Sequence, residues 1–178
     1  MARGNPEAAS RLHAPAALDD LLLYRLSRLL ATGGGMVIRL CEGRFGITRR
    51  EWRLLAVLAA EPGLLSSQLA DRVQLDRART SRAVTSLVAK QLVQRRAGRA
   101  DRRQATLALT PEGQALHGAL FPLVTAINRD IVSVLDADEL RVLDTALERL
   151  QRQAEALQAA AVLPKADRHR GRAPAVRA

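Results

Sequence analysis

A short stretch that follows Asp76 carries polar side chains of the kinds that bind nucleic acid. Asp76 is a good N-cap, and the apolar residues Ala83, Val84, Leu87 and Val88 follow it at the spacing of an amphipathic helix. The opposite face of this predicted helix combines long cations with short hydroxyl groups: Arg77, Arg79, Ser81, Arg82, Thr85 and Ser86. Arginine binds guanine through two hydrogen bonds or holds a phosphate, and serine and threonine reach base edges or backbone oxygens. The pattern predicts either a DNA-reading surface or an ordinary solvated helix face, and this helix alone does not decide between them.

The segments on both sides of this helix favour DNA binding. Apolar residues at 65, 69, 70 and 73 predict another short helix, separated from the first by about two or three residues as in a helix-turn-helix. Residues 92–96 and 104–109 predict two strands joined by a turn at 97–101, and this hairpin is rich in arginine: Arg95, Arg96, Arg99, Arg102 and Arg103. Between residues 76 and 103 there are nine Lys and Arg and two Asp, which gives this stretch +7 of the net charge of +10. Charge this concentrated needs a polyanion or heavy solvation.

Several motifs in and around this region resemble the winged helix-turn-helix regulators of the MarR type, named for multiple antibiotic resistance. They are Ser81-Arg82-Ala83-Val84 in the recognition helix, Asp101-Arg102-Arg103 at the wing, Leu109-Thr110-Pro111-Glu112-Gly113 at the next helix start, and Arg44-Phe45-Gly46-Ile47-Thr48 with Glu51-Trp52-Arg53-Leu54-Leu55 upstream. In order and spacing the resemblance extends from Leu18 to Leu157, and the combination is more specific than any single motif. It implies a mainly α fold: a winged helix-turn-helix with a small β-hairpin wing, and a helical dimerisation region formed by the N- and C-terminal helices.

The resemblance also implies a mode of DNA binding. A homodimer would place its two recognition helices in successive major grooves of a palindromic duplex site, about 34 Å apart. The wing arginines Arg99, Arg102 and Arg103 would approach the flanking minor groove or the backbone, and Asp101 would orient Arg103, a pairing common in the family. In the alternative, Asp101 and Arg103 only stabilise the hairpin turn. A nonspecific architectural DNA-binding protein is the competing function, because the net charge and a basic tail would support it equally.

Family members are usually repressors that small molecules release from DNA, often aromatic carboxylates or phenols. Here Tyr24-Arg25-Leu26-Ser27 together with Glu51-Trp52-Arg53 resembles the subgroup tied to aromatic-compound catabolism. An arginine can hold a carboxylate, while Trp52 and Tyr24 supply a flat wall and a hydroxyl. The expected effector-binding residues are therefore Tyr24, Arg25, Trp52 and Arg53. Ordinary core packing of Trp52 and a structural role for Arg53 remain open alternatives.

No constellation in the sequence predicts catalysis or a metal site. There is no G-x-S-x-G, Walker loop or CxxC motif, and His13, His117 and His169 have no metal-ligand spacing. We therefore expect neither an enzyme nor a bound cofactor. The single cysteine, Cys41, fits a reducing compartment as a buried, idle or redox-sensing thiol. No run approaches the ~20 apolar residues of a membrane span, and the N-terminus lacks the apolar segment of a signal peptide, so we expect a cytoplasmic protein without membrane contact.

Composition and breaks divide the chain into parts. We expect a flexible arm at 1–17, an N-terminal dimerisation helix region at 18–47, the DNA-binding domain at 48–112, C-terminal dimerisation helices at 113–160 and a basic disordered tail at 161–178. Aromatic residues make up only 2% of the chain, so the core must consist of leucine, alanine and valine, a composition that favours helices.

Local signals mark where the helices begin. Leucines between 18 and 30 recur at helical spacing, and Thr48, Thr110 and Asp136 have the context of N-caps, with capping boxes at the first and last of them. Gly33–Gly35 is the ambiguous stretch. Three glycines either break the first helix into a loop or are compensated by close packing.

Overall fold

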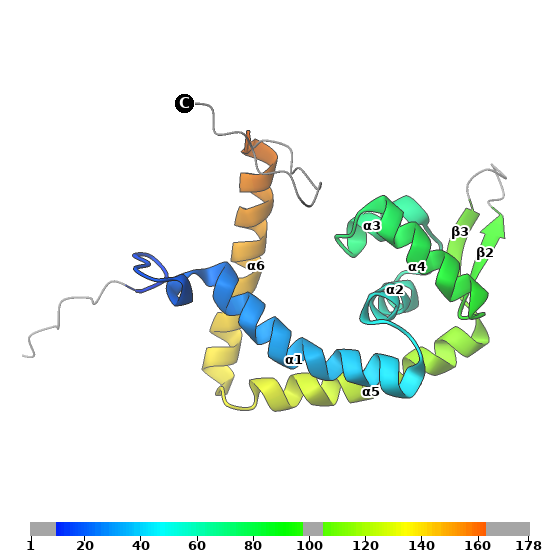
Figure 1. Cartoon of the computed structure of the whole chain (residues 1–178), viewed down its shortest axis with the longest axis horizontal. Coiled ribbons are helices and arrows are strands. Elements are labelled where there is room, and N and C mark those ends of the chain that lie inside the picture. Colours follow the sequence, from blue (N-terminus) through cyan, green and yellow to red (C-terminus); the bar gives the residue numbers. More distant parts are fainter. Residues whose placement is uncertain (1–9, 98–104, 163–178) are drawn as a thin grey trace, which may run out of the picture. The chain divides into compact units, whose positions relative to one another are not determined.

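The structure, a computed structural model, describes residues 10–97 and 105–162, and divides the sequence between Val132 and Ser133 into two compact units. The elements of the first unit (Figure 1) are η1 (Leu18–Asp20), α1 (Leu22–Phe45), α2 (Arg49–Ala60), β1 (Leu64–Leu65), α3 (Ser66–Arg72), α4 (Arg77–Ala89), β2 (Val93–Ala97), β3 (Ala105–Leu109) and α5 (Pro111–Val132). The second unit contains α6 (Ala137–Ala160). The mainly helical fold with a small hairpin is the one that the sequence predicted. The predicted turn residues 98–101 and the tail from 163 onward lie outside the described residues.

The strands form a small antiparallel sheet in the order β1-β3-β2. Val93 lies opposite Leu109 and Arg95 opposite Leu107, which is the expected hairpin. The third strand was not expected: Leu64 pairs with Leu107, and Leu65, which we assigned to the following helix, pairs with Thr106. That assignment was wrong because a strand of two residues is too short to show an alternating pattern.

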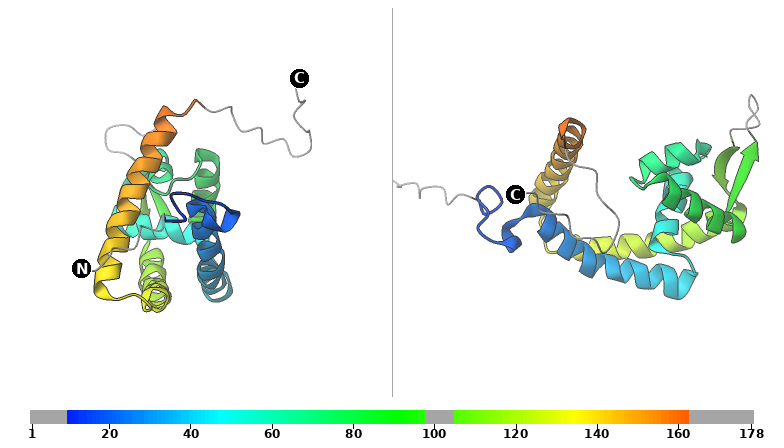
Figure 2. Two further views of the ribbon diagram at one scale, coloured as in Figure 1. Left: turned by 90° about the vertical axis from the view of Figure 1, so that its left-hand side faces the viewer. Right: turned by 45° about the horizontal axis from the view of Figure 1, so that its top comes forward.

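The first long helix differs from the sequence prediction at its start. Residues 18–20 form a 3-10 turn, and Leu21 is extended (φ −73°, ψ 125°), so α1 begins at Leu22. The glycine stretch is helical throughout, so the loop alternative is wrong. A Cβ atom at Gly33 would lie 3.0 Å from Cδ1 of Ile131 in α5, and one at Gly34 would lie 2.6 Å from Nη1 of Arg49 in α2. The missing side chain at Gly33 therefore lets α5 pack closely against α1, along which it lies (Figures 1 and 2), whereas a side chain at Gly34 would displace only the flexible end of Arg49.

The predicted N-caps are confirmed. The hydroxyl of Thr48 accepts a hydrogen bond from Glu51 N (3.2 Å), while the Glu51 carboxylate accepts one from Thr48 N (2.6 Å). Asp76 accepts from Arg79 N (2.8 Å), and Thr110 accepts from Gly113 N (3.0 Å). Asp136 caps α6 in the same way, with a reciprocal bond from its own N–H to a glutamate. Short polar side chains thus satisfy the free N–H groups that start these helices.

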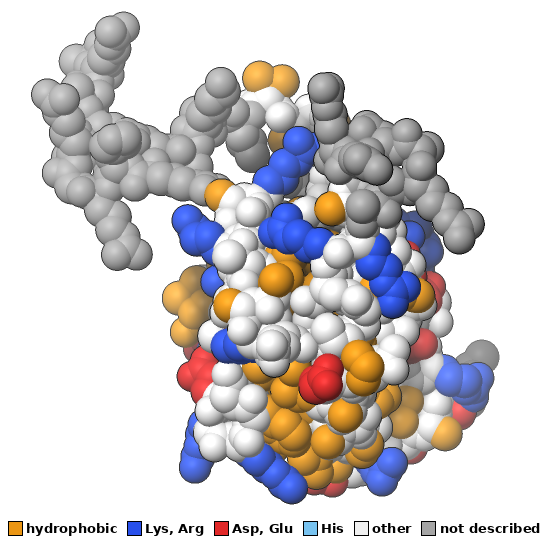
Figure 3. Space-filling view, turned by 90° about the vertical axis from the view of Figure 1, so that its right-hand side faces the viewer, with side chains coloured by type: hydrophobic (Ala, Val, Ile, Leu, Met, Phe, Trp, Pro, Cys, Tyr) orange, Lys and Arg blue, Asp and Glu red, His pale blue; other side chains and the backbone are white. Residues whose placement is uncertain are grey.

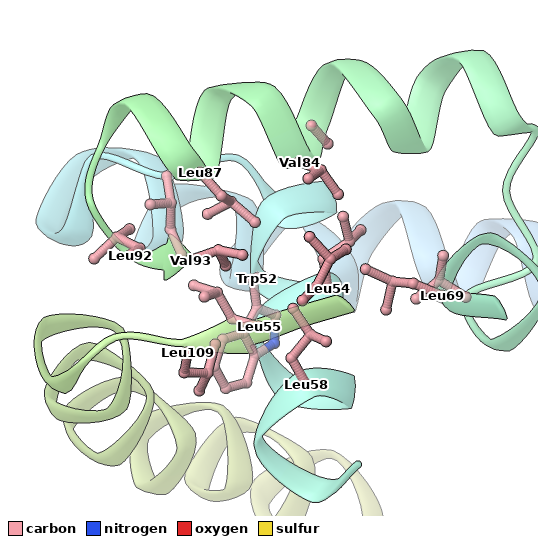
Figure 4. Close-up of a cluster of buried hydrophobic side chains, with 14 of the residues drawn as sticks. Trp52, Leu54, Leu55, Leu58, Leu69, Val84, Leu87, Leu92, Val93 and Leu109 are labelled. Atoms are coloured by element: carbon pink, nitrogen blue, oxygen red, sulfur yellow. The ribbon is translucent and has the colours of Figure 1, made fainter. Parts of the chain in front are cut away.

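The core lies where α2, α3, α4 and the strands meet at the N-terminal end of α5 (Figure 2), and we call α2, α3, α4 and β1–β3 the head. Leucine and valine side chains from each of these elements interdigitate around α2 (Figure 4). The side chains buried most completely are aliphatic: Ile47, Leu54, Leu55, Leu58, Leu69, Leu87, Leu107 and Leu120. The expected aliphatic core is confirmed, and α4 packs against it with one face.

In the second unit most of the described leucine side chains are exposed, unlike those in the core of the first unit. None of the residues of α6 is buried, and its apolar side chains are exposed at helical spacing: Val142, Leu143, Leu147, Leu150 and Leu157. Among the described helices, none is by itself long and apolar enough to cross a membrane, and only α5 and α6 taken as a bent pair meet that test, on length and composition alone.

Candidate nucleic-acid interface

The outward face of α4 presents most of the predicted DNA-binding side chains to solvent. Val84 and Leu87 point from the other side of the helix into the core (Figure 4). The exposed set consists of Arg77, Arg79, Ser81, Arg82 and Thr85. Nε of Arg79 lies 3.1 Å from Oδ2 of Asp76, so the N-cap residue also holds this guanidinium at the start of the helix. The structure thus brings long cations and short hydroxyls together on one open helical face, the arrangement that major-groove reading requires.

Ser86 differs from the rest of the predicted set. It is half-buried, and its hydroxyl hydrogen-bonds the Glu51 carboxylate of α2. On the helix it lies at the border of the apolar stripe, where sequence alone does not tell which way a small polar side chain points. Its hydroxyl already has a partner within the protein, and its role as a DNA contact stays a prediction.

A tight turn connects α3 to α4. Gln74 adopts a left-handed conformation (φ 51°), and Leu75 N donates to Ala70 O at 3.1 Å. Nη2 of Arg53 in α2 donates to Val73 O at 2.7 Å and so fastens the end of α3. Arg53, for which the sequence left effector binding and a structural role open, is an exposed side chain that braces the helix-turn-helix through a backbone carbonyl.

The described base of the wing adds charge beside α4. Arg95 and Arg96 on β2 are exposed, and the face that carries the strands shows several Lys and Arg side chains in its upper half (Figure 3). The predicted wing contacts Arg99, Arg102 and Arg103, with Asp101, lie outside the described residues.

A buried carboxylate lies behind the recognition helix. Glu51 is 2% exposed. Burial raises its pKa, but hydrogen bonds from Ser86, from the Thr48 backbone and from Lys90, with the positive charge of Lys90, outweigh burial, and the net pKa of Glu51 is lowered. The group is therefore a charged member of the core, whereas the sequence had indicated Glu51 as a capping residue and as part of the Glu51-Trp52-Arg53 motif.

A pocket of about 390 Å³ opens between the end of α2, the strands and the start of α5. Its walls are Leu58, Ala59, Pro62, Arg96, Ala108, Leu109, Gln114 and His117. The His117 ring stacks on Trp52 (centroids 5.4 Å apart, 20° between planes) and on Phe121 (5.4 Å, 29°). Burial lowers the pKa of His117, so the ring is neutral at pH 7. One cation, one amide, the His117 ring and an aliphatic wall suit a small planar anion.

Sequence reasoning missed this pocket. Its polar residues come from β2 and α5, far from Trp52 in sequence, and His117 was considered only as a metal ligand. The available signal was the spacing of His117 and Phe121, which are four residues apart and so share one face of a helix.

The structure does not bring the four predicted effector residues together within one chain. Tyr24 and Arg25 lie in the first turns of α1, whereas Trp52 packs on α5. Trp52 and Arg53 are neighbours on a helix and so point in different directions. Arg53 lines a separate pocket of about 310 Å³ with Ile38, Glu42, Thr48, Arg49, Arg50 and Leu75. Trp52 is 6% exposed and packs in the core, which was the alternative to effector binding. Its stacked partner His117 lines the first pocket.

Cys41 is fully buried in α1. Burial, followed by the negative charge of Glu42, raises the pKa of its thiol. A thiol with a raised pKa stays protonated and is a poor nucleophile, which favours the idle, buried cysteine over a redox sensor.

Comparison with known proteins agrees with this geometry. The sequence profile of the MarR family matches residues 45–104, which include α2, α3, α4 and β2. A protein of Thauera aromatica, described as a transcriptional regulatory protein for the hcr operon, is 32% identical over 108 residues, which make up 61% of this chain and 65% of that protein. Residues 45–104, which carry the helix-turn-helix, thus match the MarR family.

Solved structures show the same fold. The PcaV transcriptional regulator of Streptomyces coelicolor, in complex with its natural ligand, is 26% identical and superposes with a TM-score of 0.67 over 78% of this chain and 97% of its own. MepR of S. aureus, solved as a complex with DNA, is 20% identical, with a TM-score of 0.70 over 78% of this chain and 99% of its own, and supports the fold alone. The proteins named here are regulators and not enzymes, in agreement with the sequence-based expectation.

Proposed function

We propose that the chain is a sequence-specific DNA-binding transcriptional regulator: a cytoplasmic, homodimeric repressor that a small aromatic acid or phenol releases from a palindromic operator. The observation that carries this proposal is the exposed face of α4, where Arg77, Arg79, Arg82, Ser81 and Thr85 lie on the side opposite the buried core. The shared fold of a regulator solved on DNA supports the same use of the helix.

Exposed leucines support the homodimer. Leu23, Leu29 and Leu30 on α1 are 79%, 56% and 58% exposed, and α6 exposes a comparable row. Rows of exposed apolar side chains on a helix mark an interface, and a second copy of the same chain would cover each row symmetrically. A dimer is also what a palindromic site requires.

The pocket beside His117 supports an aromatic effector. A carboxylate or phenolate would pair with Arg96 while a ring packs on the apolar wall that includes Leu58, Pro62 and Leu109. The related regulator PcaV was solved with its natural ligand, which is consistent with ligand control of this fold. Because Arg96 belongs to the wing strand β2, an occupied pocket would bias the position of the wing. Release follows only if the ligand prefers the conformation that does not bind the operator.

Replacing Arg82 by alanine tests the reading helix. The Arg82→Ala variant is expected to lose about 30-fold or more in operator affinity, since a bidentate base contact supplies about 1–3 kcal/mol and a dimer loses two of them. Arg141→Ala, which removes an exposed arginine of α6 outside the head, is the matched control and should bind normally. Unchanged operator affinity in a dimeric Arg82→Ala variant would refute the assignment.

Fluorescence of Trp52 tests the effector site. It is the chain's single tryptophan and stacks on the ring that lines the pocket, so an aromatic acid bound there should quench or shift its emission. The response should vanish in Arg96→Ala and persist in Arg53→Ala and Arg25→Ala. A response that persists in Arg96→Ala but disappears in Arg53→Ala would instead place the ligand in the second pocket, and its loss in Arg25→Ala would place the ligand near α1.

A further inference from the structure

Glu51 is the most deeply buried acid among the described residues, and the proposed function does not use it. Its Oε2 accepts hydrogen bonds from Thr48 N (2.6 Å) and from Nζ of Lys90 (3.0 Å), and its carboxylate also accepts the hydroxyl of Ser86. Nζ of Lys90 donates in turn to Gly46 O (2.9 Å). These bonds join the junction of α1 and α2 to the last turn of α4.

The two ends of α4 are held differently. At its start, Asp76 and Arg79 interact within the helix itself. Along its length, Ala83, Val84 and Leu87 make apolar contacts, which have no preferred direction and tolerate small rotations. The bonds to Ser86 and Lys90 are directional, so they fix the rotation of α4 about its own axis.

That rotation matters for reading DNA. Arg82, Ser86 and Lys90 are spaced by four residues and form one slanting row on the helix, from the outward face to the buried carboxylate. On a helix of about 5–6 Å radius, a rotation of about 20° displaces a side-chain tip by about 2 Å. A displacement of this size breaks a bidentate contact to a base, whereas a flexible arginine can still follow a phosphate.

We propose that Glu51 and Lys90 form a positioning pair that sets the rotation of the recognition helix and thereby the operator specificity, without touching DNA. The proposal rests on the proposed function. An ion pair with a buried carboxylate is weak evidence for stability, but in some proteins such a pair selects one arrangement, and here that arrangement would be the register of α4 against α2. The lysine is half exposed, and its ammonium is directed at the Glu51 carboxylate and the Gly46 carbonyl.

The test compares Glu51→Gln, Lys90→Met and Lys90→Arg for binding to the operator and to a scrambled duplex over a range of salt concentrations. Glu51→Gln and Lys90→Met should lower the preference for the operator at least tenfold, while affinity for the scrambled duplex and its salt dependence stay within about twofold. Lys90→Arg keeps the charge and should restore most of the preference. The matched control is Glu61→Gln, which breaks the exposed pair between Glu61 and Arg72 (2.9 Å) with the same charge change and should leave the preference unaltered.

Lys90→Met keeps the proposal testable if Glu51→Gln does not fold. A salt slope reduced by about one in Lys90→Met would show that Lys90 binds a phosphate directly, and it would overturn the proposal. A preserved preference in folded Glu51→Gln, or a loss of affinity for both duplexes in proportion to lost stability, would overturn it too. If the unsubstituted protein shows no preference for any operator, the proposed function fails and this inference fails with it.

Discussion

Leucines in the head are sealed from water, whereas those of α6 face it. Leu54, Leu69 and Leu87 are 0% exposed, but Leu143 and Leu150 are 40% and 42% exposed. Both regions are helical and rich in leucine, so composition does not explain the difference. The head buries its apolar side chains within one chain, because α2 packs against α3, α4, the strands and α5. The apolar row of α6 has no such neighbours among the described residues, and a second copy of the chain is the proposed cover.

The largest expected effect comes from emptying the core of the head. Leu54→Ala should lower the free energy of unfolding by about 2–5 kcal/mol, since it leaves a cavity in a closed core. Leu150→Ala on α6 should change the unfolding of the head little and instead weaken the dimer. Urea unfolding and sedimentation measured on both variants separate the two results. Equal losses of stability with an unchanged dimer would remove the distinction between these regions.

The contrast also shows what the sequence could predict. Helix starts at Thr48, Asp76 and Asp136 depend on a few adjacent residues, and a local pattern is sufficient to find them. The outward face of α4 followed from helical periodicity in the same way. The bracing role of Arg53 was not predictable, because it depends on the Val73 carbonyl twenty residues away.

Contacts between distant segments account for the other differences. The His117 pocket needs α2, β2 and α5 to meet, and the Glu51–Lys90 pair needs α2 to meet the last turn of α4. The spacing of residues in the sequence does not predict these tertiary contacts. The effector residues on α1 and α2 were predicted from a family resemblance. Which of these side chains face the same cavity depends on the direction in which each one leaves its helix.

A second prediction concerns the junction of the head with α5. A Cβ atom at Gly113 would lie 2.0 Å from the carbonyl oxygen of Leu92, and a backbone atom cannot yield as a side chain does. Gly113→Ala should therefore destabilise the head by about 1–3 kcal/mol. Gly118→Ala in the same helix meets nothing within 4 Å and should stabilise it by about 0.5–1 kcal/mol. A thermal unfolding series in which both variants shift in the same direction would contradict the close packing at Gly113.

The smallest effect is expected in how the free energy of unfolding depends on pH under acidic conditions. The pKa of Glu51 in the folded head is lowered, whereas the unfolded value is about 4.3. Its contribution is fully present above the unfolded value and is lost as pH falls through the lowered folded value. The unfolding free energy of the unsubstituted protein should therefore fall more steeply below about pH 4 than that of Glu51→Gln. Urea titrations from pH 7 to pH 3 measure both slopes, and parallel slopes would show that the carboxylate is not held in its charged form.

The proposed function requires that the α4 face reads a specific DNA site and that a small aromatic acid ends this binding. The most direct measurement is a salt-controlled binding titration of the purified protein against the DNA upstream of its own gene and against a scrambled duplex, with and without a panel of aromatic acids. We expect a preference of about 10³ or more for the upstream DNA, lost on addition of one acid. Equal affinity for both duplexes, unchanged by every acid, would contradict this account and favour a nonspecific architectural DNA-binding protein.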